Sequence, residues 1–232
     1  MDKNGLGYYN LVDWWENDFT NTEKLYILGK YKPMGGGELN KGLILCSSAT
    51  VVNFLIGLQT WFTTLADEAI SEKILKKAES FVTDETPILD RHFLYGSFIE
   101  HYYKKRNVDL KFYELAKLYC LKQIEISKKS KEAFLSDPTF SILPRHKGYE
   151  QLAIILEKEN DYTNAMLICL AAKEIGWNTD WNKRILTLEK KEKRRTELVS
   201  ALKQGEESGL VQDFDPEKFL KNLKAKKKRS DL

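Results

Sequence analysis

Residues 146–177 read HKGYEQLAIILEKENDYTNAMLICLAAKEIGW and carry the strongest structural signal in the chain. Apolar residues recur at three- and four-residue spacing on both sides of a polar turn at 159–161, which predicts two amphipathic helices. Alanines on both apolar faces let the two helix backbones approach closely. The apolar positions of the two helices are Tyr149, Leu152, Ala153 and Leu156, then Tyr162, Ala165, Met166, Cys169 and Ala172.

This unit resembles the tetratricopeptide repeat (TPR), a helix–turn–helix unit of about 34 residues. It departs from that family at Leu156, where an aromatic residue is common, and at Trp177, where a proline usually ends the unit. The resemblance implies an all-α, TPR-like short solenoid of stacked antiparallel helix hairpins, whose groove binds a peptide or protein partner. The residues that match are Leu152, Ala153, Tyr162, Ala165 and Ala172.

Upstream of the repeat, four apolar patterns predict two further helix pairs with polar turns at 67–68 and 106–107. Ser47 or Ser48 is expected to cap the first of these helices. An irregular connection between Pro138 and Pro144 would then lead into the repeat. The expected helices extend from the serine cap to Leu65 and over 69–81, 89–105 and 110–127.

Three regions are expected. An aromatic-rich N-terminal segment, 1–46, is too apolar for a free tail and would pack on the body, with Asn21 or Thr22 capping a short helix. The TPR-like domain would occupy 47–182, and a basic helical tail 183–232. The tail holds 15 Lys and Arg against 9 Asp and Glu, so it carries +6 while the whole chain carries +3. The remainder is therefore mildly acidic.

The tail from about 198 to 226 resembles the toxin-binding segment of ParD-type antitoxins, in which a helix, a glycine turn and an acidic-aromatic stretch precede a helix bearing Phe-Leu. We expect breaks at Gly205 and Gly209 and a last helix starting at Asp215-Pro216. The resemblance implies a tail that folds around a ParE-type toxin. The DNA-binding half of that family is not recognisable. The tail residues expected to contact a partner are Leu198, Leu202, Glu206, Phe214, Phe219, Leu220 and Leu223.

Composition and motifs favour a non-catalytic cytoplasmic protein. The chain has no run of 18 apolar residues and no signal-peptide pattern. Its three cysteines lie in apolar patterns, as reduced core thiols do. Its three histidines lack metal-ligand spacing and no catalytic motif occurs, so no enzyme activity, cofactor or metal is expected.

Two kinds of partner contact remain open beside the tail. Polar positions on the first helices of the pairs are predicted to line the TPR-like groove, namely Glu100, Lys104, Glu150 and Gln151. The basic runs 190–195 and 224–229 would attract nucleic acid only non-specifically, and no base-stacking aromatic accompanies them. The first hypothesis is therefore a groove-binding interaction module. The alternative is an antitoxin-like inhibitor that acts through its tail.

Overall fold

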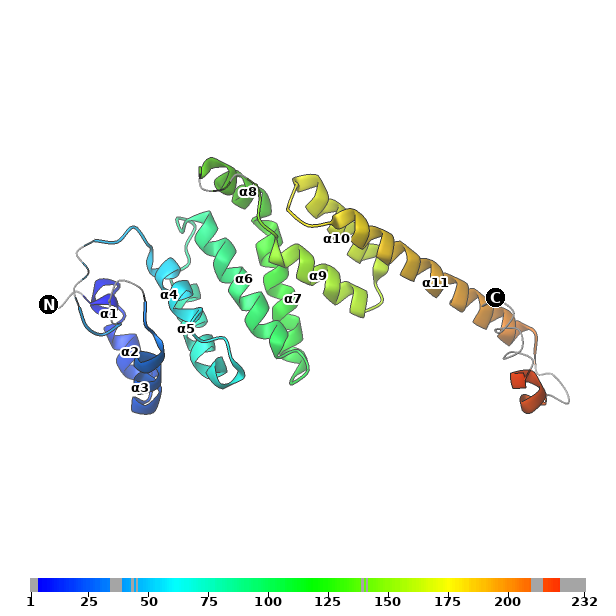
Figure 1. The fold of residues 1–232 in the computed structure, drawn as a ribbon, viewed down its shortest axis with the longest axis horizontal. Coiled ribbons are helices and arrows are strands. Elements are labelled where there is room, and N and C mark those ends of the chain that lie inside the picture. Colours follow the sequence, from blue (N-terminus) through cyan, green and yellow to red (C-terminus); the bar gives the residue numbers. More distant parts are fainter. Residues whose placement is uncertain are drawn as a thin grey trace. The chain divides into compact units, whose positions relative to one another are not determined.

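The computed structural model describes residues 4–33, 39–42, 44, 46–138, 140, 142–209 and 215–221. Every regular element among these residues is a helix, which confirms the all-α prediction (Figure 1). The chain divides into two compact units, Met1–Leu188 and Glu189–Leu232. The helices are α1 (Gly5–Tyr8), α2 (Val12–Asp18), α3 (Asn21–Lys30), α4 (Val51–Gln59), the 3₁₀ helix η1 (Leu65–Asp67), α5 (Glu68–Ser80), α6 (Ile88–Lys104), α7 (Leu110–Glu125), α8 (Ser127–Ser136), α9 (Lys147–Lys158), α10 (Tyr162–Ile175) and α11 (Trp181–Glu207).

Two helices start at caps other than those predicted. The hydroxyl of Thr20 accepts the backbone N–H of Glu23, whose carboxylate accepts the N–H of Thr20, so a capping box begins α3. Thr50, rather than Ser47 or Ser48, caps α4. Several neighbouring Ser, Thr and Asn residues have similar cap propensity. The backbone conformation at the helix start therefore decides which of them serves.

Two further boundaries differ from prediction. A separate helix, α8, follows α7 after Ile126, although its sequence SKKSKEAFLS gave little apolar periodicity. Its Phe134 is fully buried, and the helix packs against α6 and α7. The long helix α11 continues through Gly205 and ends at Glu207. An interior glycine costs a helix only about 1 kcal/mol, so it need not end one.

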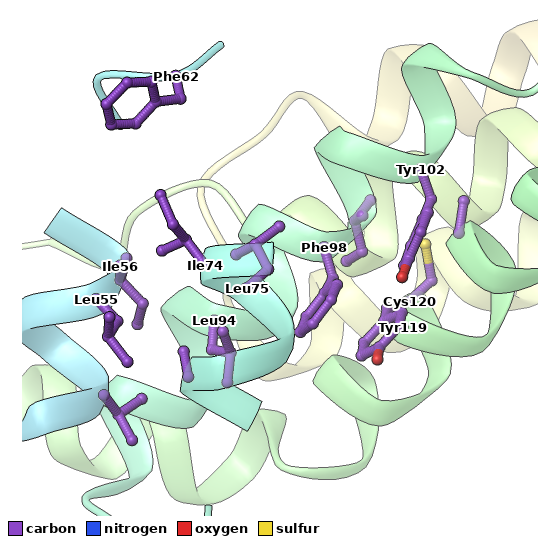
Figure 2. Packing of buried hydrophobic residues seen from close by; sticks show 14 of the residues in the cluster. Leu55, Ile56, Phe62, Ile74, Leu75, Leu94, Phe98, Tyr102, Tyr119 and Cys120 are labelled. Atoms are coloured by element: carbon purple, nitrogen blue, oxygen red, sulfur yellow. The ribbon is translucent and has the colours of Figure 1, made fainter. Parts of the chain in front are cut away.

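The core of the first unit is built around α6, which packs against α4, α5, α7, α8 and α9. Its side chain Phe98 lies parallel to the ring of Tyr119 from α7, with ring centroids 4.1 Å apart (Figure 2). Tyr102, one turn along α6, stacks against the same tyrosine. Each fully buried aromatic side chain contributes about 3 kcal/mol of apolar burial, so α6 and α7 form the most strongly packed pair.

The cysteines do not behave alike. Cys120 on α7 and Cys169 on α10 are buried, and burial raises the pKa of the Cys120 thiol to about 12. Cys46 lies in the segment before α4 and is exposed, so its predicted core position is wrong. It lies outside any helix, where no apolar face holds it in the core.

A buried carboxylate ties the N-terminal helices to the rest of the first unit. The Asp67 side chain has no exposed surface and accepts hydrogen bonds from Tyr26 Oη at 2.7 Å and Lys30 Nζ at 2.6 Å. Thr64 donates its N–H and its hydroxyl to the same carboxylate. Although burial raises the pKa of Asp67, these donors outweigh it and hold the pKa well below its usual range.

The Asp67→Asn variant should lower the free energy of unfolding by about 1–2 kcal/mol at pH 7, because the amide loses the charge-assisted bond to Lys30. Urea titration followed by circular dichroism measures the change. The exposed variant Asp84→Asn, in the turn after α5, serves as the control and should be neutral. Equal stability of the two variants would show that the Lys30–Asp67 pair adds nothing.

Candidate functional site

A groove of about 550 Å³ lies beside α6 in the first unit. Its walls are the C-terminal end of α4, the loop 60–64, the start of α5, one face of α6 and the first residue of α9. We refer to this concavity as the α6 groove. Because α4, η1, α5, α6 and α9 all contribute to its lining, residues far apart in sequence meet there.

One face of α6 supplies the polar floor of the groove through Ser97, Glu100, His101 and Lys104. Their spacing of three and four residues places them on one side of a helix. Glu100 lies between two cations, with Lys147 Nζ at 2.6 Å and Lys104 Nζ at 3.0 Å. The hydrogen bond from Lys147 holds the pKa of Glu100 below its usual range. All three side chains are about half exposed, so this ion network faces solvent.

His101 forms a neutral part of the floor. Its side chain is 5% exposed, and its Nε2 lies 3.9 Å from the Glu72 carboxylate, too far for a strong hydrogen bond. Burial, with a further contribution from Lys105, lowers the pKa of His101 to about 4. At neutral pH the imidazole is therefore uncharged, and the charge of the groove comes from its lysines, Arg106 and two glutamates.

The structure brings together only half of the four predicted groove residues. Glu100 and Lys104 line the groove, whereas Glu150 and Gln151 do not. Glu150 accepts a hydrogen bond from Arg145 Nε at 2.7 Å and another from Thr179. The contribution of α9 is Lys147 instead, one turn before Gln151. Lys147 was not among the predicted groove residues. The sequence signal that could have found it is its spacing of four residues from Gln151, which places both on the same face of the helix.

The groove also contains an apolar side chain that was expected on the apolar face of a helix running to Leu65, whereas α4 ends at Gln59. Leu65, in η1, is 79% exposed and lines the groove. Phe62 lies buried beneath the same wall. An exposed leucine beside a charged network offers a partner both an apolar contact and ionic contacts.

Five of the seven predicted tail residues are described, three of them on α11 and two on a short helix at 216–221. Glu206 is exposed near the end of α11. Phe214 and Leu223 lie outside the described residues. The remaining four are exposed by about half or more: Leu198 61%, Leu202 59%, Phe219 49% and Leu220 53%.

A second group of polar side chains lies inside the core. His92, His146 and Trp177 contact one another, with ring centroids 4.6–5.8 Å apart. His146 Nδ1 accepts the Tyr149 N–H and caps α9. One buried nitrogen of each of the three rings lacks a hydrogen-bond partner among the described residues. Burial lowers the pKa of His92 to about 4 and that of His146 to about 3.

This cluster offers no ligand set for a metal ion. In the described part of the chain, no three or more His, Cys, Asp and Glu side chains gather as they would around a metal. The hydrophobic partners of the cluster, such as Phe134, make edge-on ring contacts with His92 and Trp177. The two histidines therefore pack in the core as part of an aromatic cluster.

Comparisons of the chain with protein-family models, curated proteins and solved structures give no match. The class that the structure defines is an all-helical protein whose first unit has a charged, solvent-facing groove. None of the helices among the described residues is long and apolar enough to cross a membrane.

Proposed function

We propose that the protein is a non-catalytic interaction module that binds an extended peptide segment of a protein partner in the α6 groove. The single observation that carries this proposal is the convergence of Lys104, Glu100, Lys147 and exposed Leu65 on one solvent-facing concavity. The described residues contain no group of three or more His, Cys, Asp and Glu side chains that could hold a metal ion. Non-covalent recognition requires only such a mixture of apolar and charged contacts.

A TPR-like arrangement of the first unit supports the proposal. The packing order pairs α4 with α5, α6 with α7 and α9 with α10, and then joins α5 to α6 and α7 to α9. The first helices of the three pairs also contact one another, α4 with α6 and α6 with α9. In a stack of helix hairpins the first helices line the concave side, and α4, α6 and α9 each contribute residues to the α6 groove.

In the expected binding mechanism, an apolar contact supplies affinity and charged contacts set the register of the bound peptide. Leu65 would pack against an apolar side chain of the partner and contribute most of the affinity. The Lys104–Glu100–Lys147 network is half exposed, so its ion pairs are weak and can be exchanged for pairs with the partner at little cost. A partner carboxylate between the two lysines, beside an apolar residue, would fix the register.

This proposal can be tested with peptide ligands selected from a random peptide library. The selected peptides carry a fluorescent tag, and fluorescence polarisation measures their affinity for the protein. The double variant Lys104→Glu/Lys147→Glu should weaken binding of the selected peptides at least about tenfold, since two attractive contacts become repulsive. Leu65→Ser should weaken it by a similar factor through loss of the apolar contact. Circular dichroism checks that both variants fold.

The matched control is Lys128→Glu/Lys129→Glu, which makes the same change in net charge at two exposed positions of α8 outside the groove. It should leave the affinity unchanged. Peptides that bind all three variants as tightly as the natural sequence would show that the groove is not the binding site.

A second candidate function rests on the exposed apolar side chains Leu198, Leu202, Phe219 and Leu220. Their exposure supports a tail that is covered by a partner, as the ParD-like resemblance implies, and a ParE-type toxin is the partner of that proposal. Truncation after Lys190 separates the two candidates. A partner lost on truncation favours the tail, whereas a partner retained favours the groove.

A further inference from the structure

Charge and apolar side chains are arranged in blocks along the second unit's part of α11. Five of the six residues 190–195 are basic, whereas Glu206 and Glu207 make the end of the helix acidic. Between them lie Leu198, Val199 and Leu202, which are 61%, 43% and 59% exposed. When two copies of such a helix segment lie antiparallel, the basic start of each faces the acidic end of the other and the apolar middles meet.

The register of this segment makes that complementarity specific. Residues 195, 199, 202 and 206 recur at spacings of four, three and four, so they share one face of the helix. The spacing is symmetric about the midpoint between Ser200 and Ala201. When a second identical helix lies antiparallel, Arg195 is therefore opposite Glu206, and Val199 is opposite Leu202.

We propose that α11 pairs antiparallel with α11 of a second copy of this chain through this face. Arg194 and Glu207 flank this face at the levels of Arg195 and Glu206 and carry the same charges as those neighbours, so they add to the attraction at each end of the pair. A parallel pair would place arginine against arginine and glutamate against glutamate, which repel. The proposal does not depend on the function proposed for the α6 groove.

Little has to be broken for this pair to form. Arg195 makes an ion pair within its own helix to Glu192, with the nitrogen 3.9 Å from the oxygen, and the arginine side chain is 54% exposed. An exposed ion pair of that length contributes little to stability. Exchange of that ion pair for one with Glu206 of the second copy therefore costs little.

The contact between the two α11 helices is small, so we expect its affinity to be low. From 195 to 206 the helix rises about 16 Å, enough for two apolar layers with an ionic layer at each end. That is well below the standard interface of about 1,600 Å², so we expect a dissociation constant on the order of 10–100 μM. Association should thus appear only as the concentration rises.

Sedimentation velocity of the full chain, from about 1 μM to about 1 mM, measures this association. The natural sequence should shift from monomer to dimer. Arg194→Glu/Arg195→Glu should weaken self-association at least about tenfold, and Glu206→Arg/Glu207→Arg should do the same, because each variant then meets like charges. An equimolar mixture of the two variants should dimerise again, since the ionic contacts at both ends become attractive between unlike chains.

The control for net charge is Lys190→Glu/Lys193→Glu, which changes the charge equally on the opposite side of the helix and should dimerise like the natural sequence. All these positions are exposed, and circular dichroism reports whether the helix remains. The proposal is overturned by a natural chain that stays monomeric throughout, by reversal variants that associate unchanged, or by a mixture that fails to recover. Association driven by Phe219 and Leu220 instead of α11 would survive both reversals and would also overturn it.

Discussion

Acidification from pH 7 to pH 5 should lower the free energy of unfolding by about 4–6 kcal/mol, a large part of the stability of a typical domain. The three histidines cause this loss. Burial lowers the pKa of His92 and His101 to about 4 and that of His146 to about 3, all below the ordinary value of 6.5. In the unfolded chain they take up protons near pH 6.5, whereas in the folded protein they remain neutral.

The sign of this change in stability follows from the number of protons that each state binds. Between pH 6.5 and about 4 the unfolded state binds more protons than the folded state, so stability falls as the pH falls. Each histidine then contributes about 1.4 kcal/mol per pH unit below 6.5, or about 2 kcal/mol at pH 5. Carboxylates with lowered pKa, such as Glu23 and Glu100, add a loss in the same direction only below about pH 4.5.

Urea titrations at half-unit steps from pH 7.5 to 4.5, followed by circular dichroism, give the unfolding free energy at each pH. The variant His92→Phe keeps an aromatic ring beside Phe134 and Trp177 but removes one titrating group. Its loss between pH 7 and 5 should be smaller by about 2 kcal/mol. A flat profile for the natural sequence would mean that the histidines are not buried as described.

Replacement of Gln123 by Leu should lower the free energy of unfolding by about 2–4 kcal/mol. Gln123 is 1% exposed and joins three helices through its side-chain amide. Its Nε2 donates to the carbonyl of His92 on α6 at 2.7 Å, and its Oε1 accepts the N–H of Gly148 on α9 at 2.6 Å. A leucine leaves both backbone groups without these bonds in the core.

The Gly148 N–H carries most of the cost. It belongs to the first turn of α9, where backbone N–H groups have no partner within the helix. Two glycines also leave room for the amide: a Cβ on Gly148 would lie 2.9 Å from Gln123 Oε1, and one on Gly96 would lie 3.1 Å from Nε2. Gln123 and the two glycines therefore connect α6, α7 and α9 through close packing and hydrogen bonds. We refer to these three residues as the Gln123 joint.

Two variants make this measurement specific. Gln123→Glu keeps the acceptor for Gly148 but loses the donor to His92, and places a carboxyl group in the core. It should be destabilised as well, and less so at low pH, where the carboxyl is protonated. Gln204→Leu, at an exposed position of α11, should be neutral. The free energy of unfolding is measured by urea denaturation. A value for Gln123→Leu within about 0.5 kcal/mol of the natural sequence would show that the Gln123 hydrogen bonds do not stabilise the packing of α6, α7 and α9.

Local periodicity in the sequence determined the helical class and most helix positions. The apolar spacing around residues 149–172 predicted α9, α10 and the turn between them, because helix-period patterns are a local property of the chain. The same spacing placed Glu100 and Lys104 on one face of α6, and both line the groove. The weak pattern of α8 was not recognised, since that helix buries little more than Phe134.

Only the tertiary structure decided which residues meet. Lys147 rather than Glu150 or Gln151 completes the groove, because α9 is placed along its axis so that its first turn, and not the next one, faces Glu100. Nothing local marks Gln123 as a joint, since its partners His92 and Gly148 lie 31 and 25 residues away. Local sequence fixes the faces of each helix, whereas the contacts between faces depend on close packing among all helices at once.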